Sequence, residues 1–189
     1  MKKIIAIIVG AFLVVSVVIG GMWIGAYNGA VKRQNTVVEY QGNVHAALSN
    51  RYEKIGVFID AIEGANATVL AYLETITDAR SDFAAAIEAG NASLADSEAE
   101  TVDGTFVTLV SYMEDNPDSY NTVGLYSGFM SEFSASTNAV TFAINEYNES
   151  VTNYNNHIDT FPNLIFLGSW EAKTPYSLDN YSQPLPTFN

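Results

Sequence analysis

An uncharged run near the N-terminus constrains this chain more than any other feature. Residues 4–31 contain no Asp, Glu, Lys or Arg. About 20 apolar residues in a helix suffice to cross a hydrocarbon core of roughly 30 Å. Trp23 and Tyr27 stand where an interfacial aromatic belt would fall, and Lys32-Arg33 close the run. The sequence therefore predicts a transmembrane anchor over residues 4–26 that inserts into the lipid bilayer.

A cleaved signal peptide is the alternative interpretation of this run. The apolar region of a signal peptide is about 7–15 residues long and ends in an A-x-A-like site. The run here is longer, and the residue two places before Ala26 is Ile24 rather than a small residue. A retained single-pass anchor in the cell membrane is therefore the expectation.

The charges that flank the anchor do not fix its orientation. The basic N-terminus, residues 1–3, carries Lys2 and Lys3, and Lys32-Arg33 balance them on the other side. Composition gives a weaker guide, because the remaining chain has few basic residues, no cysteine and much Asn, Ser, Thr and Tyr. Such a composition favours a domain on the extracytoplasmic side of the membrane.

The part of the chain after the anchor is strongly acidic. The net charge of the chain is −13, and leaving out Lys2 and Lys3 makes it −15 for the remainder. Such a surface repels phosphate backbones, so nucleic acid is not an expected partner. The absence of cysteine excludes disulfides and thiolate sites.

Apolar residues recur with alternating three- and four-residue spacing near the C-terminal end. This spacing predicts one long helix over residues 121–161, with a narrow apolar seam of the coiled-coil kind. Asn121 is a plausible N-cap, and Pro162 ends the helix. The seam consists of Val123, Tyr126, Met130, Phe133, Thr137, Val140, Ile144, Tyr147, Val151, Tyr154, Ile158 and Phe161.

Three further helices are predicted, over residues 27–63, 67–89 and 101–114. The first continues the anchor and carries a stripe at Leu48, Tyr52, Ile55, Ile59 and Ile62, which weakens backward through Val31, Gln34, Val38, Gln41 and His45. Short turns between successive helices favour an all-α, antiparallel four-helix bundle over residues 27–161. The tail, residues 162–189, contains prolines and is expected to be irregular. Its apolar segment 164–170 should pack on the base of the bundle or lie in the bilayer interface.

The chain resembles the LemA family over nearly its full length. Residues 147–162 reproduce the family pattern Y-N-x-x-V-x-x-Y-N-x-x-I-x-x-F-P, and residues 76–81 are similar to its V-T-E-A-R-S segment. Residues 48–56 depart from the pattern, with one arginine fewer and Gly56 for proline, and residues 136–138 lack a usual glutamate. The resemblance implies a single anchor, a helical bundle and no established enzymatic activity.

Six residues are candidates for setting helix register or for an interaction. Arg80 falls on the seam of its helix, where its head either snorkels to the surface or pairs with a carboxylate. Tyrosines on a buried seam need partners for their hydroxyl groups. The candidates are Arg51, Arg80, Tyr147, Asn148, Tyr154 and Asn155.

No catalytic, cofactor-binding or metal-ligating set is predicted. His45 and His157 each stand alone on a helix, without a second ligand at helical spacing. The acidic residues between Asp96 and Asp103 are expected to form a loop, and Thr101 occupies the place where a calcium-binding loop needs glycine. An enzyme and a cofactor are therefore not expected.

Two functional hypotheses follow. The first is a non-enzymatic, membrane-anchored scaffold or interaction module with a protein partner or with copies of itself. The alternative is a membrane-anchored sensor that binds a small ligand or cation within the bundle. Gln34, Gln41 and His45 on one stripe are the support for the sensor, and a polar interior at that stretch would favour it.

Overall fold

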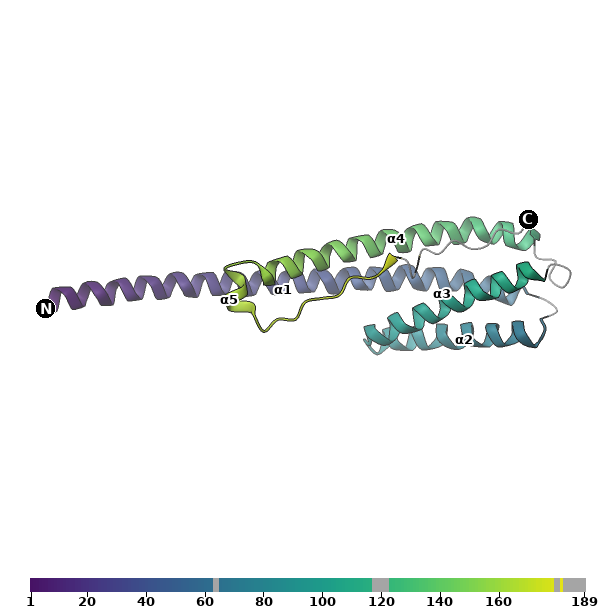
Figure 1. Cartoon of the computed structure of the whole chain (residues 1–189), viewed down its shortest axis with the longest axis horizontal. Coiled ribbons are helices and arrows are strands. Elements are labelled where there is room, and N and C mark those ends of the chain that lie inside the picture. Colours follow the sequence, from purple (N-terminus) through teal and green to yellow (C-terminus); the bar gives the residue numbers. More distant parts are fainter. Residues whose placement is uncertain (63–64, 117–122, 179–180, 182–189) are drawn as a thin grey trace. The chain divides into compact units, whose positions relative to one another are not determined.

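The computed structural model describes residues 1–62, 65–116, 123–178 and 181, and the side chains of residues 123–127 lie outside the described part. Over these residues the chain is all-α, as predicted, with helices in the order α1, α2, α3, α4 and α5 (Figure 1). Their bounds are Lys2–Asp60 for α1, Ala67–Glu88 for α2, Ala92–Asp115 for α3, Val123–Asp159 for α4 and Asn163–Leu167 for α5.

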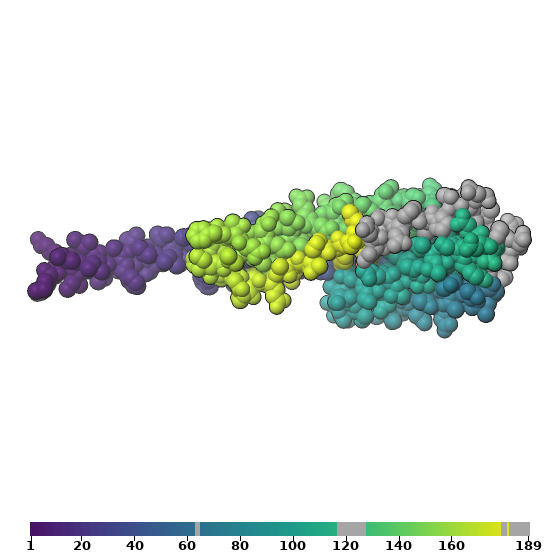
Figure 2. Space-filling view, viewed as in Figure 1, coloured from purple at the N-terminus to yellow at the C-terminus, as the bar shows by residue number. Residues whose placement is uncertain are grey.

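The first turns of α1 carry the predicted anchor. They have a mean hydropathy of 2.9 in their most apolar window, and α1 is long and apolar enough to cross a membrane. Large side chains such as Ile7 and Val17 are more than two-thirds exposed. In the space-filling view no other segment covers this end of α1 (Figure 2). Residues 2–25 would extend over about 36 Å at the rise of an α-helix, which matches the thickness of a bilayer core.

The chain divides into two compact units. The first unit comprises residues 1–40 and 147–175, and the second comprises residues 41–146 and 176–189. Both α1 and α4 contribute residues to each unit.

The second unit is a four-helix core with an aromatic centre. Phe58 of α1 packs against Phe106 of α3, with ring centroids 5.8 Å apart, and Phe106 lies 5.5 Å from Phe133 of α4. On α2, Ile76 and Phe83 are buried, and the Phe83 ring lies 5.1 Å from that of Tyr52 on α1. The helices therefore meet through large apolar side chains at helical spacing, as the stripes predicted.

Side-chain caps begin α2 and α3, and one glycine shapes the turn between these helices. Asn66 Oδ1 accepts a hydrogen bond from the Val69 amide at 3.0 Å, and Asn91 Oδ1 accepts one from the Leu94 amide at 3.2 Å. Gly90 adopts a φ of +68°, a left-handed conformation that ends α2 at low cost only for glycine. This turn allows α3 to begin at Ala92, directly after its cap.

The start of α3 differs from the predicted helix over residues 101–114, and the stretch 96–103 is helical rather than a loop. The inward face of these turns consists of Ala95 and Ala99, both fully buried. Alanine adds little to a hydrophobic pattern but has the highest helix propensity. The acidic residues of this stretch therefore suggested a loop, although its backbone is helical.

Two other helix ends also differ from the predictions. α1 ends at Asp60 rather than near residue 63, and α4 ends at Asp159, ahead of Pro162. The predicted N-cap Asn121 lies outside the described residues.

Two seam assignments are wrong, because Phe161 is 77% exposed and Val38 is 61% exposed. The buried line of α1 passes through Ala30, Val37 and Val44 instead.

The first unit packs the C-terminal turns of α4 against α1. The His157 ring donates a hydrogen bond from Nε2 to the Ala26 carbonyl oxygen at 2.9 Å, and its Nδ1 lies 3.2 Å from Nδ2 of Asn163. Gly29 makes this approach possible, because a Cβ there would lie 2.7 Å from the imidazole. At the same level of α1, the Tyr27 ring lies 5.6 Å from the Trp170 ring, edge to face.

Candidate functional site

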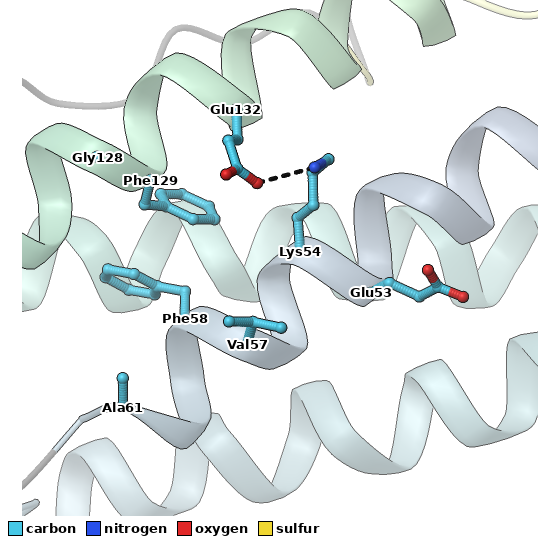
Figure 3. A pocket seen from close by; sticks show the side chains of 8 residues that line it. All are labelled: Glu53, Lys54, Val57, Phe58, Ala61, Gly128, Phe129 and Glu132. Carbon is cyan, nitrogen blue, oxygen red and sulfur yellow. Dashed lines mark hydrogen bonds and ion pairs between the residues drawn. The ribbon is translucent and has the colours of Figure 1, made fainter.

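A groove on the second unit lies between α1 and α4 (Figure 3). Its volume is about 560 Å³, within the range of ligand and peptide pockets. The floor is apolar, with the buried Phe58 ring 4.5 Å from the Phe129 ring and the preceding residue, Val57, exposed. The lining residues are Glu53, Lys54, Val57, Phe58, Ala61, Gly128, Phe129 and Glu132.

One ion pair closes the rim of this groove. Lys54 Nζ donates a hydrogen bond to Glu132 Oε2 at 2.9 Å (Figure 3). The bond to the ammonium group lowers the pKa of Glu132 below its usual range. Because both groups are solvated, the pair adds little to stability but gives the apolar floor a charged edge.

Arg51 lies in a buried charged cluster of the second unit. Its Nη2 atom forms an ion pair with Asp103 Oδ1 at 3.1 Å, although the two groups are not aligned for a hydrogen bond. Its Nη1 atom donates a hydrogen bond to the Tyr181 carbonyl oxygen at 2.8 Å. The guanidinium also stacks over the Phe133 ring, 4.5 Å from its centroid. Tyr52 donates its hydroxyl proton to the Ala99 carbonyl oxygen at 3.1 Å beside this cluster.

Asp103 is the residue of this cluster that the sequence interpretation missed. Burial raises the pKa of Asp103 to about 7, against the opposing attraction of Arg51 and the Tyr52 hydroxyl. The same burial, reinforced by the Asp103 charge, raises the pKa of Tyr52. A usable signal was present, because Asp103 stands four residues after Ala99 and three before Phe106 on one helix face.

A second polar cluster occupies the stretch where Gln41 and His45 suggested a polar stripe. His45 Nε2 lies 3.1 Å from Asp96 Oδ1, and the Tyr176 hydroxyl donates to the same carboxylate oxygen. Gln41 also bonds the Tyr176 hydroxyl, whose pKa is raised by burial and by its bond to Asp96. His45 is therefore engaged with a carboxylate on α3, and the bundle interior is polar at this level.

Arg80 lies against the backbone of α1 instead of in a described ion pair. It is partly buried on α2, and a Cβ on Gly56 would lie 2.5 Å from its Nη1 and Nη2 atoms. The Arg80 Nε atom is buried and has no hydrogen-bond partner among the described residues. Gly56 is thus the residue that lets the guanidinium approach the helix.

Two Tyr-Asn pairs of α4, residues 147–148 and 154–155, supply four of the candidates. Three of these four bond residues 171–174 of the tail. Tyr147 donates its hydroxyl to the Thr174 carbonyl oxygen at 3.2 Å, and Tyr154 donates to that of Glu171 at 3.1 Å. Asn155 bonds Lys173 twice, accepting from its amide at 2.8 Å and donating to its carbonyl at 2.9 Å. Asn148 is partly buried on the same helix. The buried tyrosines thus obtain main-chain partners.

The described residues contain no group of three or more His, Asp or Glu side chains placed to hold a metal ion. The carboxylates of Asp96 and Asp103, expected in a solvated loop, instead face His45 and Arg51. What the fold defines is a helical bundle whose first helix has the length and apolarity of a membrane span.

The LemA family model matches residues 40–183, and the chain therefore belongs to the LemA family. The predicted anchor lies outside the matched range, so the match is narrower than the resemblance that the sequence suggested. No curated protein and no solved structure matches the chain.

Proposed function

We propose that this LemA protein is a non-enzymatic, membrane-anchored interaction module. The observation that carries the proposal is the groove of the second unit, with its apolar floor and the charged rim of Lys54 and Glu132. A stripe of apolar side chains on a partner helix, flanked by charges, would complement such a surface. The partner is a helical segment of another protein or of a second copy, held at the membrane by residues 4–26.

The burial pattern supports this proposal. Val57, at the mouth of the groove, is 73% exposed, although Ile55 and Phe58 beside it in sequence are buried. Large exposed apolar side chains at a hollow surface favour association. The polar residues with the most unusual environments, Arg51 and His45, are engaged inside the bundle and contribute nothing to this rim.

Crosslinking tests the proposal at one position. A photoreactive amino acid at the exposed Ala61 should capture a partner in intact membranes, and Val57→Asp should abolish the adduct. Leu70→Asp, on an exposed site of α2, is the control and should leave capture unchanged. The mass of the adduct distinguishes a second copy from another protein. Capture that is indifferent to Val57→Asp, or no capture at all, would exclude this surface.

The second candidate is a sensor, and the cluster of Gln41, His45, Asp96 and Tyr176 is the observation that favours it. A ligand that bonds these groups would alter how the tail residue Tyr176 is held. Thermal unfolding of the full chain with a panel of divalent cations tests this candidate. A cation that raises the midpoint in the native chain but not in Asp96→Asn supports it, and an unchanged midpoint throughout argues against it.

The bundle is proposed to lie outside the cytoplasm. Composition supports this orientation, since the net charge of −15 after the anchor would be repelled by the anionic lipid of the cytoplasmic leaflet.

A further inference from the structure

Three apolar side chains next to the anchor are exposed in the first unit. Phe161 is 77% exposed, Leu164 is 50% exposed and Ile165 is 68% exposed. We call these three residues the apolar rim. They belong to residues 160–170, which contain no charged side chain, whereas Leu167 in the same segment is buried. The segment therefore packs with one side and leaves its other apolar side uncovered.

The contacts of the first unit place this segment at the end of the anchor. His157 bonds the carbonyl oxygen of Ala26, only three residues beyond Trp23, which corresponds to a helical rise of about 4.5 Å. Tyr154 lines a hollow with Gln34, further along α1, so α4 runs antiparallel to α1 and residues after His157 lead back toward Trp23. Figure 1 shows α5 beside α1 at this level.

Aromatic contacts attach the end of the segment to the same level of α1. Trp170 packs on Tyr27 at 5.6 Å, and Tyr27 lies 5.9 Å from Trp23. Tryptophan and tyrosine prefer the region between acyl chains and headgroups. The apolar rim thus emerges where the exposed span of α1 ends and its packed part begins, at Ala26.

We infer that the apolar rim inserts into the interfacial region of the same bilayer that holds α1. The protein then touches the membrane twice, through the spanning helix and through α5. A bilayer fits the rim because a surface of Phe, Leu and Ile without charge gains free energy when it leaves water for the acyl boundary. Continuity with the anchor selects lipid over a second copy or a partner protein as the occupant.

The chain has no cysteine, so one introduced thiol gives a unique reporter. Ile165→Cys in the full chain is labelled with an environment-sensitive fluorophore and reconstituted into phosphatidylcholine vesicles. Nitroxide-labelled lipids, with the nitroxide either near the headgroup or near the chain end, act as quenchers. Val17→Cys, 74% exposed in the anchor, and Leu70→Cys, 55% exposed on α2 of the second unit, are the controls.

The fluorophore at position 165 should emit at a shorter wavelength than at position 70. The shallow nitroxide should quench it more strongly than the deep one, whereas position 17 should respond to the deep one as well. Leu164→Cys should repeat the result independently. Water-like emission at both rim positions, equal to that at position 70, would overturn the inference. Blue-shifted emission that neither lipid quenches would assign the rim to a protein contact and would also overturn it.

Discussion

Nη2 of Arg51 lies 3.1 Å from Oδ1 of Asp103, and the two side chains are only 2% and 5% exposed. An ion pair taken out of water gives up the hydration of two charges, and the attraction between them must offset this loss. Burial outweighs that attraction at Asp103, whose pKa is raised from 3.8 to about 7. The Asp103 carboxyl group therefore titrates near neutral pH.

Stability should depend on pH through Asp103. Because its folded-state pKa lies above its unfolded value, the folded state holds this proton more tightly. The stabilisation is complete below the unfolded pKa near 3.8 and is lost as pH rises through about 7. The free energy of unfolding of the full chain, measured by chemical denaturation, should therefore decrease as pH rises through this range. Asp103→Asn should remove it, and a variant with the native pH profile would contradict the assignment.

Gly56→Ala should stabilise the protein less than the same change does at an unobstructed helical site, although alanine is the better helix former. At such a site, for example Gly42, the change should stabilise by about 0.5–1 kcal/mol. At Gly56 the new Cβ would lie 2.5 Å from the Arg80 guanidinium, whereas nothing lies within 4 Å at Gly42. The guanidinium ends a flexible side chain and can shift, so the overlap should offset only part of the gain. Calorimetric melting compares the two variants, and Arg80→Ala should restore the full gain. Equal stabilisation by the two substitutions would refute the contact.

Asn155→Ala should free the tail segment that the Tyr-Asn pairs hold. The substitution removes both hydrogen bonds to Lys173, worth about 1 kcal/mol each. Lys173 is the last basic residue of the chain, so trypsin cleavage there releases a single C-terminal peptide. Mass spectrometry should detect this peptide several times faster from Asn155→Ala. Asn153→Ala, on the exposed face of α4, should be cleaved at the native rate. Equal rates would show that these bonds do not restrain the tail.

Val151→Asp tests the buried seam of α4 in the first unit. Val151 is 1% exposed, and a carboxylate there has no described partner. Burying it should cost several kcal/mol and should unfold the first unit. Glu149→Asp, two residues earlier on the exposed face, should melt with the native chain. Circular dichroism at rising temperature separates the two, and identical melting curves would show that the register is wrong.

Thiol labelling in intact cells tests the proposed orientation. Because the native chain has no cysteine, Leu70→Cys, at an exposed site of α2, should react with a membrane-impermeant maleimide only if the bundle lies outside the cytoplasm. Full labelling before the membrane is opened is the expected result. A cytoplasmic protein with an exposed thiol is the control for leakage. Labelling that requires permeabilised cells would reverse the orientation.

The helices were predictable where large apolar residues repeat, and less so where small ones do. The seam of α4 from Phe133 to Ile158 has its large apolar members buried, because Phe, Ile and Val at three- and four-residue spacing create a strong periodic signal. The start of α3 was missed because Ala95 and Ala99 bury little apolar area. In α1, Ala30 takes part in the packing where the pattern favoured larger neighbours.

The buried polar clusters were less predictable than the helices. Arg51 bonds a carbonyl oxygen 130 residues away in the sequence, and no local spacing indicates such a partner. Asp96 and Asp103 stood among other acidic residues, a pattern that is typical of a solvated surface. Only the tertiary packing separates the buried Asp103 and the partly buried Asp96 from the exposed Glu100 on the same helix.

Residues 171–174 of the tail are held through their main chain. Tyr147, Tyr154 and Asn155 bond three carbonyl oxygens and one amide in this stretch. These bonds follow the backbone and do not depend on which side chains residues 171–174 carry. This stretch can therefore change in composition without losing its place, provided that position 173 is never proline, which lacks the amide proton that Asn155 accepts.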